Sequence, residues 1–184
     1  VDKVGVMFTE IGCVESRKAY KEFVDTTYPN DTLVEKGLAS FMTENQSVHL
    51  LWPNTNWFSF LKRMYYFNHH NPKQVEILFA DRNWLDRSML EARDSIMADN
   101  IISTILSDSI QKSLIIMNYR HAYLTSGNCG NYISQKFPDK VANVMINFGK
   151  ADLISAILKP GNEMIKPIQY GKWDVAFEQI EDSD

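Results

Sequence analysis

Four ionisable side chains stand just past the ends of short apolar runs that predict strands. They are Glu10, Glu44, Asp81 and His121. In an open parallel sheet the carboxyl ends of the strands share one edge, and ligands bind in the crevice outside it. Carboxylates and an imidazole gathered there could bind a divalent metal or position a water molecule for general-base attack. The alternative is that they are ordinary polar groups of surface loops.

Arg93 is predicted to join this edge from a helix. Arg93, Met97 and Asn100 are four and three residues apart, so they share one helix face, and we expect Met97 to be buried there. A guanidinium on a partly buried face needs a carboxylate partner, and Glu10 or Glu44 is available. The alternative is a solvated arginine without an acidic neighbour.

Short apolar runs alternate with amphipathic segments along most of the chain. The runs predict buried strands at residues 4–8, 39–43, 75–80, 113–117, 141–148 and 173–177. Apolar side chains three and four residues apart predict helices at residues 16–28, 57–67, 85–105 and 131–137. This succession favours an α/β fold with a mostly parallel sheet of about five or six strands flanked by helices. We expect one domain over residues 1–177 and an acidic tail at 178–184.

Composition restricts the partners of the chain. Its 184 residues are 45% hydrophobic, which suits one globular domain. The formal charge is −4 and the 19 Lys and Arg residues are scattered, so we do not expect nucleic acid as a partner. No apolar run approaches the ~20 residues of a membrane helix, so no membrane span is expected. A small-molecule ligand or substrate is the expected partner, and the sequence gives no signal for oligomeric state.

The amino terminus leaves the location of the protein open. No signal-peptide pattern is present there. The chain begins at Val1 rather than at a methionine, so a processed start is one alternative. Both a cytoplasmic and a processed extracytoplasmic location are compatible with the sequence.

The two cysteines, Cys13 and Cys129, are too few for a disulfide framework or a Cys-rich zinc site. The chain also lacks a Gly-x-Ser-x-Gly elbow and a His-Glu-x-x-His motif. Cys13 could act as a nucleophile only if a cation such as Arg17, one helical turn away, lowered the pKa of its thiol. A buried, inert thiol is the expectation for Cys129.

The segment from Arg93 to Ile101 resembles the Arg-x-x-x-Met-Ala-x-Asn-Ile segment of erythromycin esterase-like proteins, whose wider group includes the haem-binding ChaN-like proteins. Other segments resemble that family in the same order, as scattered short motifs over most of the chain. They are Val6 to Gly12 with Glu10 at a glutamate position, Phe41 to Glu44, Trp52 to Asn68, Phe79 to Asp81, Leu114 to Gly127 and Lys172 to Phe177.

The resemblance implies a ChaN-like/erythromycin esterase-like fold and a hydrolytic site that uses Glu, Arg and His side chains. On this basis Glu10, Glu44, His121 and Arg93 are the candidate catalytic residues. The candidate ligand-binding residues are Cys13, Asp81, Asn118 and Arg120. In the esterases a histidine three residues after the first glutamate is taken as the base, and this chain has Cys13 there.

Further departures from the family pattern weaken the implied esterase activity. Of the two histidines usual in the later loop only His121 remains, with Asn118 or Leu124 at the other place. Two functions follow from the resemblance. One is a hydrolase of ester or lactone bonds with degenerate catalytic residues, with or without a divalent metal. The other is a non-catalytic protein that binds a small ligand, for which haem held by His121 or Cys13 is the suggested candidate.

Overall fold

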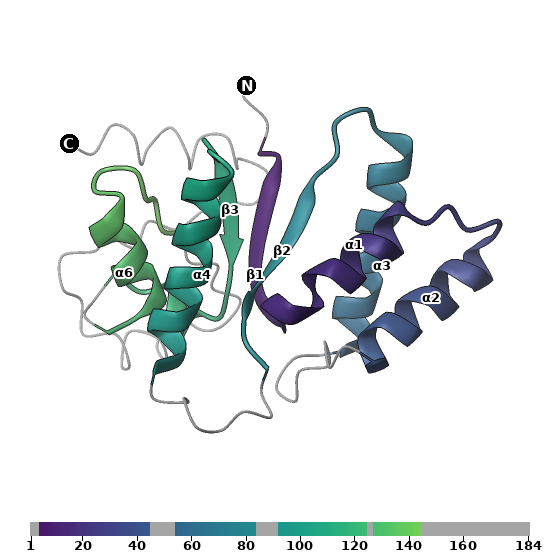
Figure 1. Cartoon of the computed structure of the whole chain (residues 1–184), viewed down its shortest axis with the longest axis horizontal. Coiled ribbons are helices and arrows are strands. Elements are labelled where there is room, and N and C mark those ends of the chain that lie inside the picture. Colours follow the sequence, from purple (N-terminus) through teal and green to yellow (C-terminus); the bar gives the residue numbers. More distant parts are fainter. Residues whose placement is uncertain (1–3, 45–53, 84–91, 125–126, 145–184) are drawn as a thin grey trace, which may run out of the picture. The chain divides into compact units, whose positions relative to one another are not determined.

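A parallel three-stranded sheet forms the centre of the fold (Figure 1). The computed structural model describes residues 4–44, 54–83, 92–124 and 127–144. Its strands are β1 (Val6–Cys13), β2 (Glu76–Asp81) and β3 (Ser113–Ile116). They lie in the order β2-β1-β3, and both pairings are parallel. The predicted α/β class, with a parallel sheet flanked by helices, is therefore present.

The sheet is smaller than the sequence predicts, because the described residues contain three strands and not five or six. Residues 141–144 have no regular structure, and the rest of the predicted strand 141–148 lies outside the described residues, as do 173–177 and the tail 178–184. The chain divides into two units, Val1–Val141 and Ala142–Asp184, and the sheet with its helices belongs to the first unit. A single domain over residues 1–177 stays a prediction.

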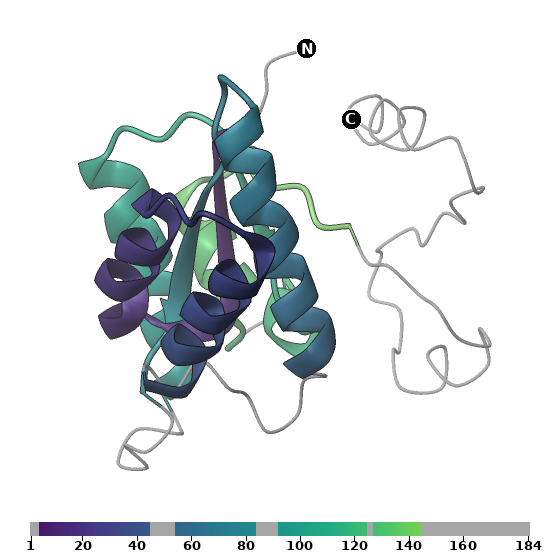
Figure 2. The ribbon, with the colours of Figure 1, turned by 90° about the vertical axis from the view of Figure 1, so that its right-hand side faces the viewer.

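Helices cover both faces of the sheet (Figures 1 and 2). One face carries α1 (Arg17–Asp25), α2 (Asp31–Glu44) and α3 (Asn54–His70), and the other carries α4 (Arg93–Ser107) and α6 (Cys129–Lys136). A 3-10 turn (Val14–Ser16) precedes α1, and the short α5 (Tyr119–Ala122) follows β3. Successive strand residues point to opposite faces. Met7 and Ile11 accordingly belong to the core under α1–α3, and Phe8 to the core under α4 and α6.

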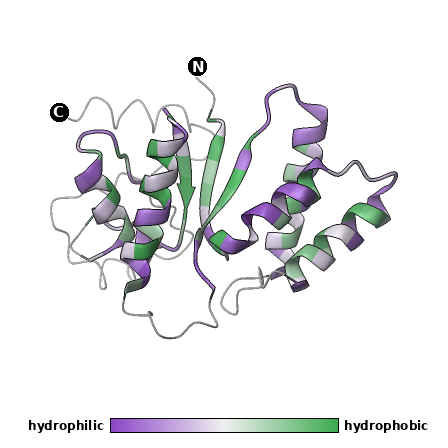
Figure 3. Cartoon of the chain, in the orientation of Figure 1, coloured by the Kyte–Doolittle hydropathy of each residue, from purple (hydrophilic) through white to green (hydrophobic). Residues whose placement is uncertain are grey.

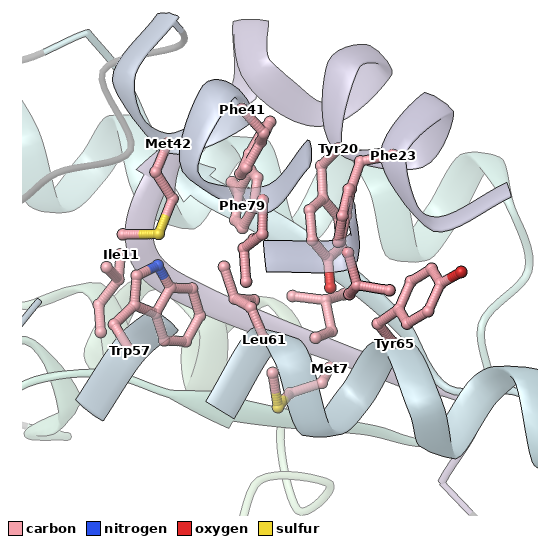
Figure 4. Packing of buried hydrophobic residues seen from close by; sticks show 13 residues of the cluster. Met7, Ile11, Tyr20, Phe23, Phe41, Met42, Trp57, Leu61, Tyr65 and Phe79 are labelled. Carbon is pink, nitrogen blue, oxygen red and sulfur yellow. The ribbon is translucent and has the colours of Figure 1, made fainter. Parts of the chain in front are cut away.

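Hydrophobic strands account for this layered arrangement. In Figure 3 the strands are mostly green, while the helices show both green and purple residues, as elements with one buried face do. No helix in the described ranges is long and apolar enough to cross a membrane. Figure 4 shows the aromatic side of the core, where Phe79 of β2 stands between helix side chains. Its ring centroid is 5.1 Å from that of Tyr20 and 6.0 Å from that of Phe41.

The strand predicted at residues 39–43 is wrong, because helix α2 runs through it to Glu44. The buried residues of α2 are Val34, Leu38, Phe41 and Met42. Their spacing of four, three and one residues places them on one helix face. The short run around Phe41 is therefore the buried stripe of a helix, and Glu44 does not stand at a strand end.

Strand β1 is longer than predicted and contains an irregularity. The predicted strand ends at Phe8 and gives way to a loop, but β1 continues to Cys13, so Glu10 lies inside the strand. The pairing with β2 shifts register between Thr9 and Cys13. Gly12 within this bulge has φ +116°, and a Cβ there would lie 2.7 Å from the Phe79 ring. Bulges re-aim side chains next to functional sites, and this one adjoins Glu10.

Side chains complete the hydrogen bonding of β2 beside the bulge. The carbonyl of Phe79 accepts from Nε of Arg17 at 2.8 Å. The carbonyl of Ala80 accepts from the amide of Asn100 on α4 at 2.9 Å. Buried backbone carbonyls require such partners, so Arg17 and Asn100 support the strand that ends in Asp81.

Candidate functional site

Arg93, the first residue of α4, stands at the centre of a cluster of ionisable side chains. Its Nε and Nη2 donate to the same oxygen of Asp81, Oδ2, at 2.9 and 2.7 Å. Nη2 also lies 3.3 Å from Oε2 of Glu10. Nη1 lies 2.9 Å from Nε2 of His121. The predicted contact between Arg93 and Glu10 is therefore present, but the main partner of Arg93 is Asp81, and Met97 is fully buried as predicted.

The two carboxylates of this cluster are buried deeply. Glu10 and Asp81 are each 1% exposed. The backbone N–H of Asn118 donates to Oε1 of Glu10, and that of Arg82 donates to Oδ1 of Asp81 at 2.9 Å. Burial raises the pKa of Glu10 and the charge of Asp81 adds to the rise, whereas the Asn118 hydrogen bond and the charge of Arg93 oppose it. Arg93 lies closer to Asp81 than to Glu10, so its positive charge balances the negative charge of Glu10 less completely.

This raised pKa gives a prediction for Glu10→Gln. A carboxyl whose folded pKa exceeds its unfolded value, here near 4.5, contributes stability below that value, and the contribution is lost as the pH rises through the folded pKa. Glutamine cannot ionise, so the variant does not lose this stability, and its amide oxygen still accepts the Asn118 N–H. Urea unfolding from pH 4 to 8 should therefore show the free energy of unfolding of Glu10→Gln increasing relative to that of the wild type as the pH rises. Glu44→Gln, at the exposed end of α2, is the matched control.

The opposite slope would count against this explanation for Glu10. A variant that lost stability relative to the wild type with rising pH would mean that Arg93 holds Glu10 ionised more strongly than burial opposes it.

His121 has both ring nitrogens engaged. Nδ1 lies 2.8 Å from Oδ1 of Asp94, and Nε2 lies 2.9 Å from Nη1 of Arg93 and 3.4 Å from Oε2 of Glu10. An arginine only donates, so Nε2 offers its lone pair, and Nδ1 carries the proton that Asp94 accepts. This arrangement corresponds to the neutral Nδ1–H tautomer. The His121, Arg93 and Asp94 side chains are 16, 15 and 24% exposed, so the cluster reaches solvent on their side.

Local backbone features hold His121 in place. Oδ1 of Asn118 accepts the N–H of Arg120 at 3.1 Å and so caps the short helix α5. A Cβ on Gly130 of α6 would collide with the backbone carbonyl of Ala122 on α5, so glycine permits these helices to approach closely. Asp94 also accepts the N–H of Cys129 at 2.8 Å, which links α4 to the start of α6.

Three of the predicted site residues lie away from the Arg93 cluster. Glu44 is exposed at the end of α2, where Ser40 donates a hydrogen bond to it. Arg120 is exposed and contacts Tyr119 through Nε at 3.2 Å. Cys13 is buried at the end of β1, with its sulfur 2.9 Å from the Ser16 hydroxyl. The structure thus gathers Glu10, Asp81, Arg93, Asn118 and His121, and not the other three.

The thiol of Cys13 is not activated. Burial raises its pKa rather than lowering it. Arg17, the cation considered for its activation, donates instead to the Phe79 carbonyl and to the Thr104 hydroxyl at 3.0 Å. Cys129 is fully buried, as predicted, and burial together with the charge of Asp94 raises the pKa of its thiol.

Asp94 is the member of the cluster that sequence reasoning missed. The helical spacing argument selected Arg93, Met97 and Asn100, and an immediate neighbour of Arg93 points about 100° away from that face. The usable signal was an acidic residue in the first turn of a predicted helix, where a carboxylate is favoured by the helix dipole. That signal alone does not identify a histidine partner 27 residues later.

The residues present do not fit a metal ion or haem. Within the described ranges, no three His, Cys, Asp or Glu side chains are arranged to hold a metal ion. The cationic guanidinium of Arg93 occupies the space between Glu10, Asp81 and His121 that a metal would need. Haem iron would require the lone pair of His121 Nε2, which faces Arg93, or the thiol of Cys13, which is buried against Ser16.

The topology places this cluster where ligands bind in α/β sheets. The chain leaves β1 toward α1 on one face and leaves β3 toward α6 on the other, and β1 and β3 are neighbours. In α/β sheets, ligands commonly bind outside the carboxyl ends of the strands at such a switch point. Glu10 near the end of β1 and Asn118 just after β3 meet at this point.

The chain matches no protein-family model, no curated protein and no solved structure.

Proposed function

We propose that the protein is a hydrolase of ester or lactone bonds in which His121 activates water. The observation that carries this proposal is the pair of contacts on His121, with Asp94 on Nδ1 and with Arg93 and Glu10 beside Nε2. Imidazole is the side chain best suited to general-base catalysis near neutral pH.

Arg93 and Glu10 supply the remaining functions of this proposal. In the resting geometry Nη1 of Arg93 faces the lone pair of Nε2 at 2.9 Å. A substrate carbonyl oxygen that accepted this N–H would free Nε2 to take a proton from water and would place a cation beside the developing oxyanion. A buried carboxyl with a raised pKa, as in Glu10, is suited to return a proton to the leaving oxygen.

The proposal differs from the sequence-based expectation in one respect. Cys13 at the expected histidine position predicts a weak or inactive esterase. The contacts of His121 support a base that approaches the site from β3 instead of β1. The resemblance to erythromycin esterase-like proteins stays a prediction. It suggests the ester or lactone substrate, whereas the role proposed for His121 rests on the contacts within the cluster.

A panel of simple esters and lactones tests the proposal with variants of both residues. Turnover by the wild type should survive Cys13→Ala and fall by about 10²–10⁴-fold in His121→Ala. His121→Asn, which can still donate to Asp94 but has no basic nitrogen, should fall equally. His70→Ala, at the exposed end of α3, should retain wild-type turnover.

Two results would contradict the proposal. Turnover lost in Cys13→Ala and kept in His121→Asn would assign the reaction to the thiol. No turnover in any protein of the panel would favour the alternative function, a non-catalytic protein that binds a small ligand at the same cluster.

A further inference from the structure

Asp94 makes two contacts through one oxygen. Its Oδ1 accepts from Nδ1 of His121 and from the backbone N–H of Cys129, each at 2.8 Å. The first contact links Asp94 to the imidazole, and the second anchors it to the first turn of α6. Asp94 itself lies in the first turn of α4. The carboxylate of Asp94 therefore links α4, on which it lies, both to α6 and to His121.

We infer that Asp94 is a positioning residue that orients His121 and stabilises the imidazolium formed when Nε2 takes a proton. This inference rests on the proposed function, because it assigns a role in the step that His121 performs. Asp94 contacts Nδ1, the ring nitrogen opposite the one that takes the proton, so it acts through His121.

Geometry and charge support this role. A carboxylate only accepts, so Asp94 keeps the proton of the neutral ring on Nδ1 and leaves the lone pair on Nε2, the nitrogen that faces Glu10 and Arg93. When Nε2 takes a proton from water, the O–H bond breaks, the water oxygen bonds to the substrate carbonyl carbon and the ring becomes a cation. As the bond to the leaving oxygen breaks, Glu10 gives that oxygen a proton, and the proton on Nε2 then returns to Glu10. Asp94 stabilises the ring cation from the Nδ1 side, as the aspartate does in serine hydrolases that pair an aspartate with a histidine.

The competing explanation is that Asp94 only caps α6. Asp94→Asn separates the two roles, because the amide oxygen can still accept from Cys129 and from Nδ1, while the negative charge is lost. Asp94→Ala removes both contacts. Asp99→Asn, on the exposed side of the same helix, is the matched control for the change of charge.

Proton NMR and kinetics measured on the same proteins test the inference. The wild type and Asp99→Asn should show a downfield Nδ1–H resonance of His121, assigned by its loss in His121→Asn. Asp94→Asn should shift that resonance upfield and lower kcat by about 10²–10⁴-fold, with KM changed less than about twofold. Its midpoint of urea unfolding should match that of the Asp99→Asn control, whereas Asp94→Ala should unfold at lower urea.

A resonance that is unchanged in Asp94→Asn would overturn the inference, and so would a shifted resonance with unchanged kcat. Failure of the proposed function gives a different result, since the wild type would then show the downfield resonance but no turnover.

Discussion

Replacing Arg93 with methionine should lower the free energy of unfolding by about 3–5 kcal/mol at neutral pH, the range found when one partner of a buried ion pair is removed. Methionine fills similar volume but leaves Glu10 and Asp81, each 1% exposed, without their cation. The absence of the two short bonds to Asp81, at 2.7 and 2.9 Å in the wild type, should account for most of the decrease. Urea unfolding at pH 7, compared with the wild type, measures the effect.

The loss of stability in Arg93→Met should become smaller as the pH falls. Protonation of the buried carboxyls removes the unpaired charge, so the gap between Arg93→Met and the wild type should narrow as the pH falls toward about 4. Arg63→Met, at an exposed position of α3, should stay within about 0.5 kcal/mol of the wild type. An Arg93→Met protein as stable as that control at pH 7 would show that the cluster is not held by its ion pairs.

Replacing Gly12 with alanine should cost about 2–6 kcal/mol of the free energy of unfolding, because backbone strain and overpacking each contribute about 1–3 kcal/mol. Strain arises because φ is +116° at this position. Overpacking arises because the new Cβ would lie 2.7 Å from the ring of Phe79, which is fully buried and in contact with Tyr20 and Phe41. Thermal or urea unfolding of the purified variant measures the loss.

Two glycine controls separate the causes. Gly127→Ala shares the positive φ, at +84°, but meets nothing within 4 Å, so it should show the strain alone. Gly5→Ala has open space and an ordinary φ and should be nearly neutral. Equal losses in Gly12→Ala and Gly127→Ala would mean that the Phe79 ring moves aside at little cost.

The three strands in the described residues were all visible in the sequence. Residues 4–8, 75–80 and 113–117 each begin or contain an observed strand, because a central strand buried on both faces reads as an unbroken apolar run. The strand predicted at residues 39–43 is wrong because short apolar runs are ambiguous. A few apolar letters fit a buried strand or a buried helix stripe, and only the wider spacing back to Val34 and Leu38 distinguishes them.

The candidate site was only partly predictable. Strand ends and helix spacing were enough to bring together Asp81, Arg93 and His121. The extension of β1 past Glu10 was not visible, because a polar residue inside a strand is tolerated only through partners far away in the sequence, which for Glu10 are Arg93 and Asn118. Asp94 was missed because its partner lies in another element, and spacing within one helix carries no information about such contacts.

The strand order also determines when this protein can acquire its site during synthesis. The first strand, β1, pairs with residues about 70 and about 107 positions later, as Val6 with Glu76 and with Ser113. Glu10 must wait for Arg93, 83 residues later, and for Asn118, 108 residues later. Contacts between such distant residues form slowly, because the chain loses entropy in closing a long loop before the contacts stabilise it. A nascent chain that ends before Asn118 therefore contains Glu10 without its full set of partners.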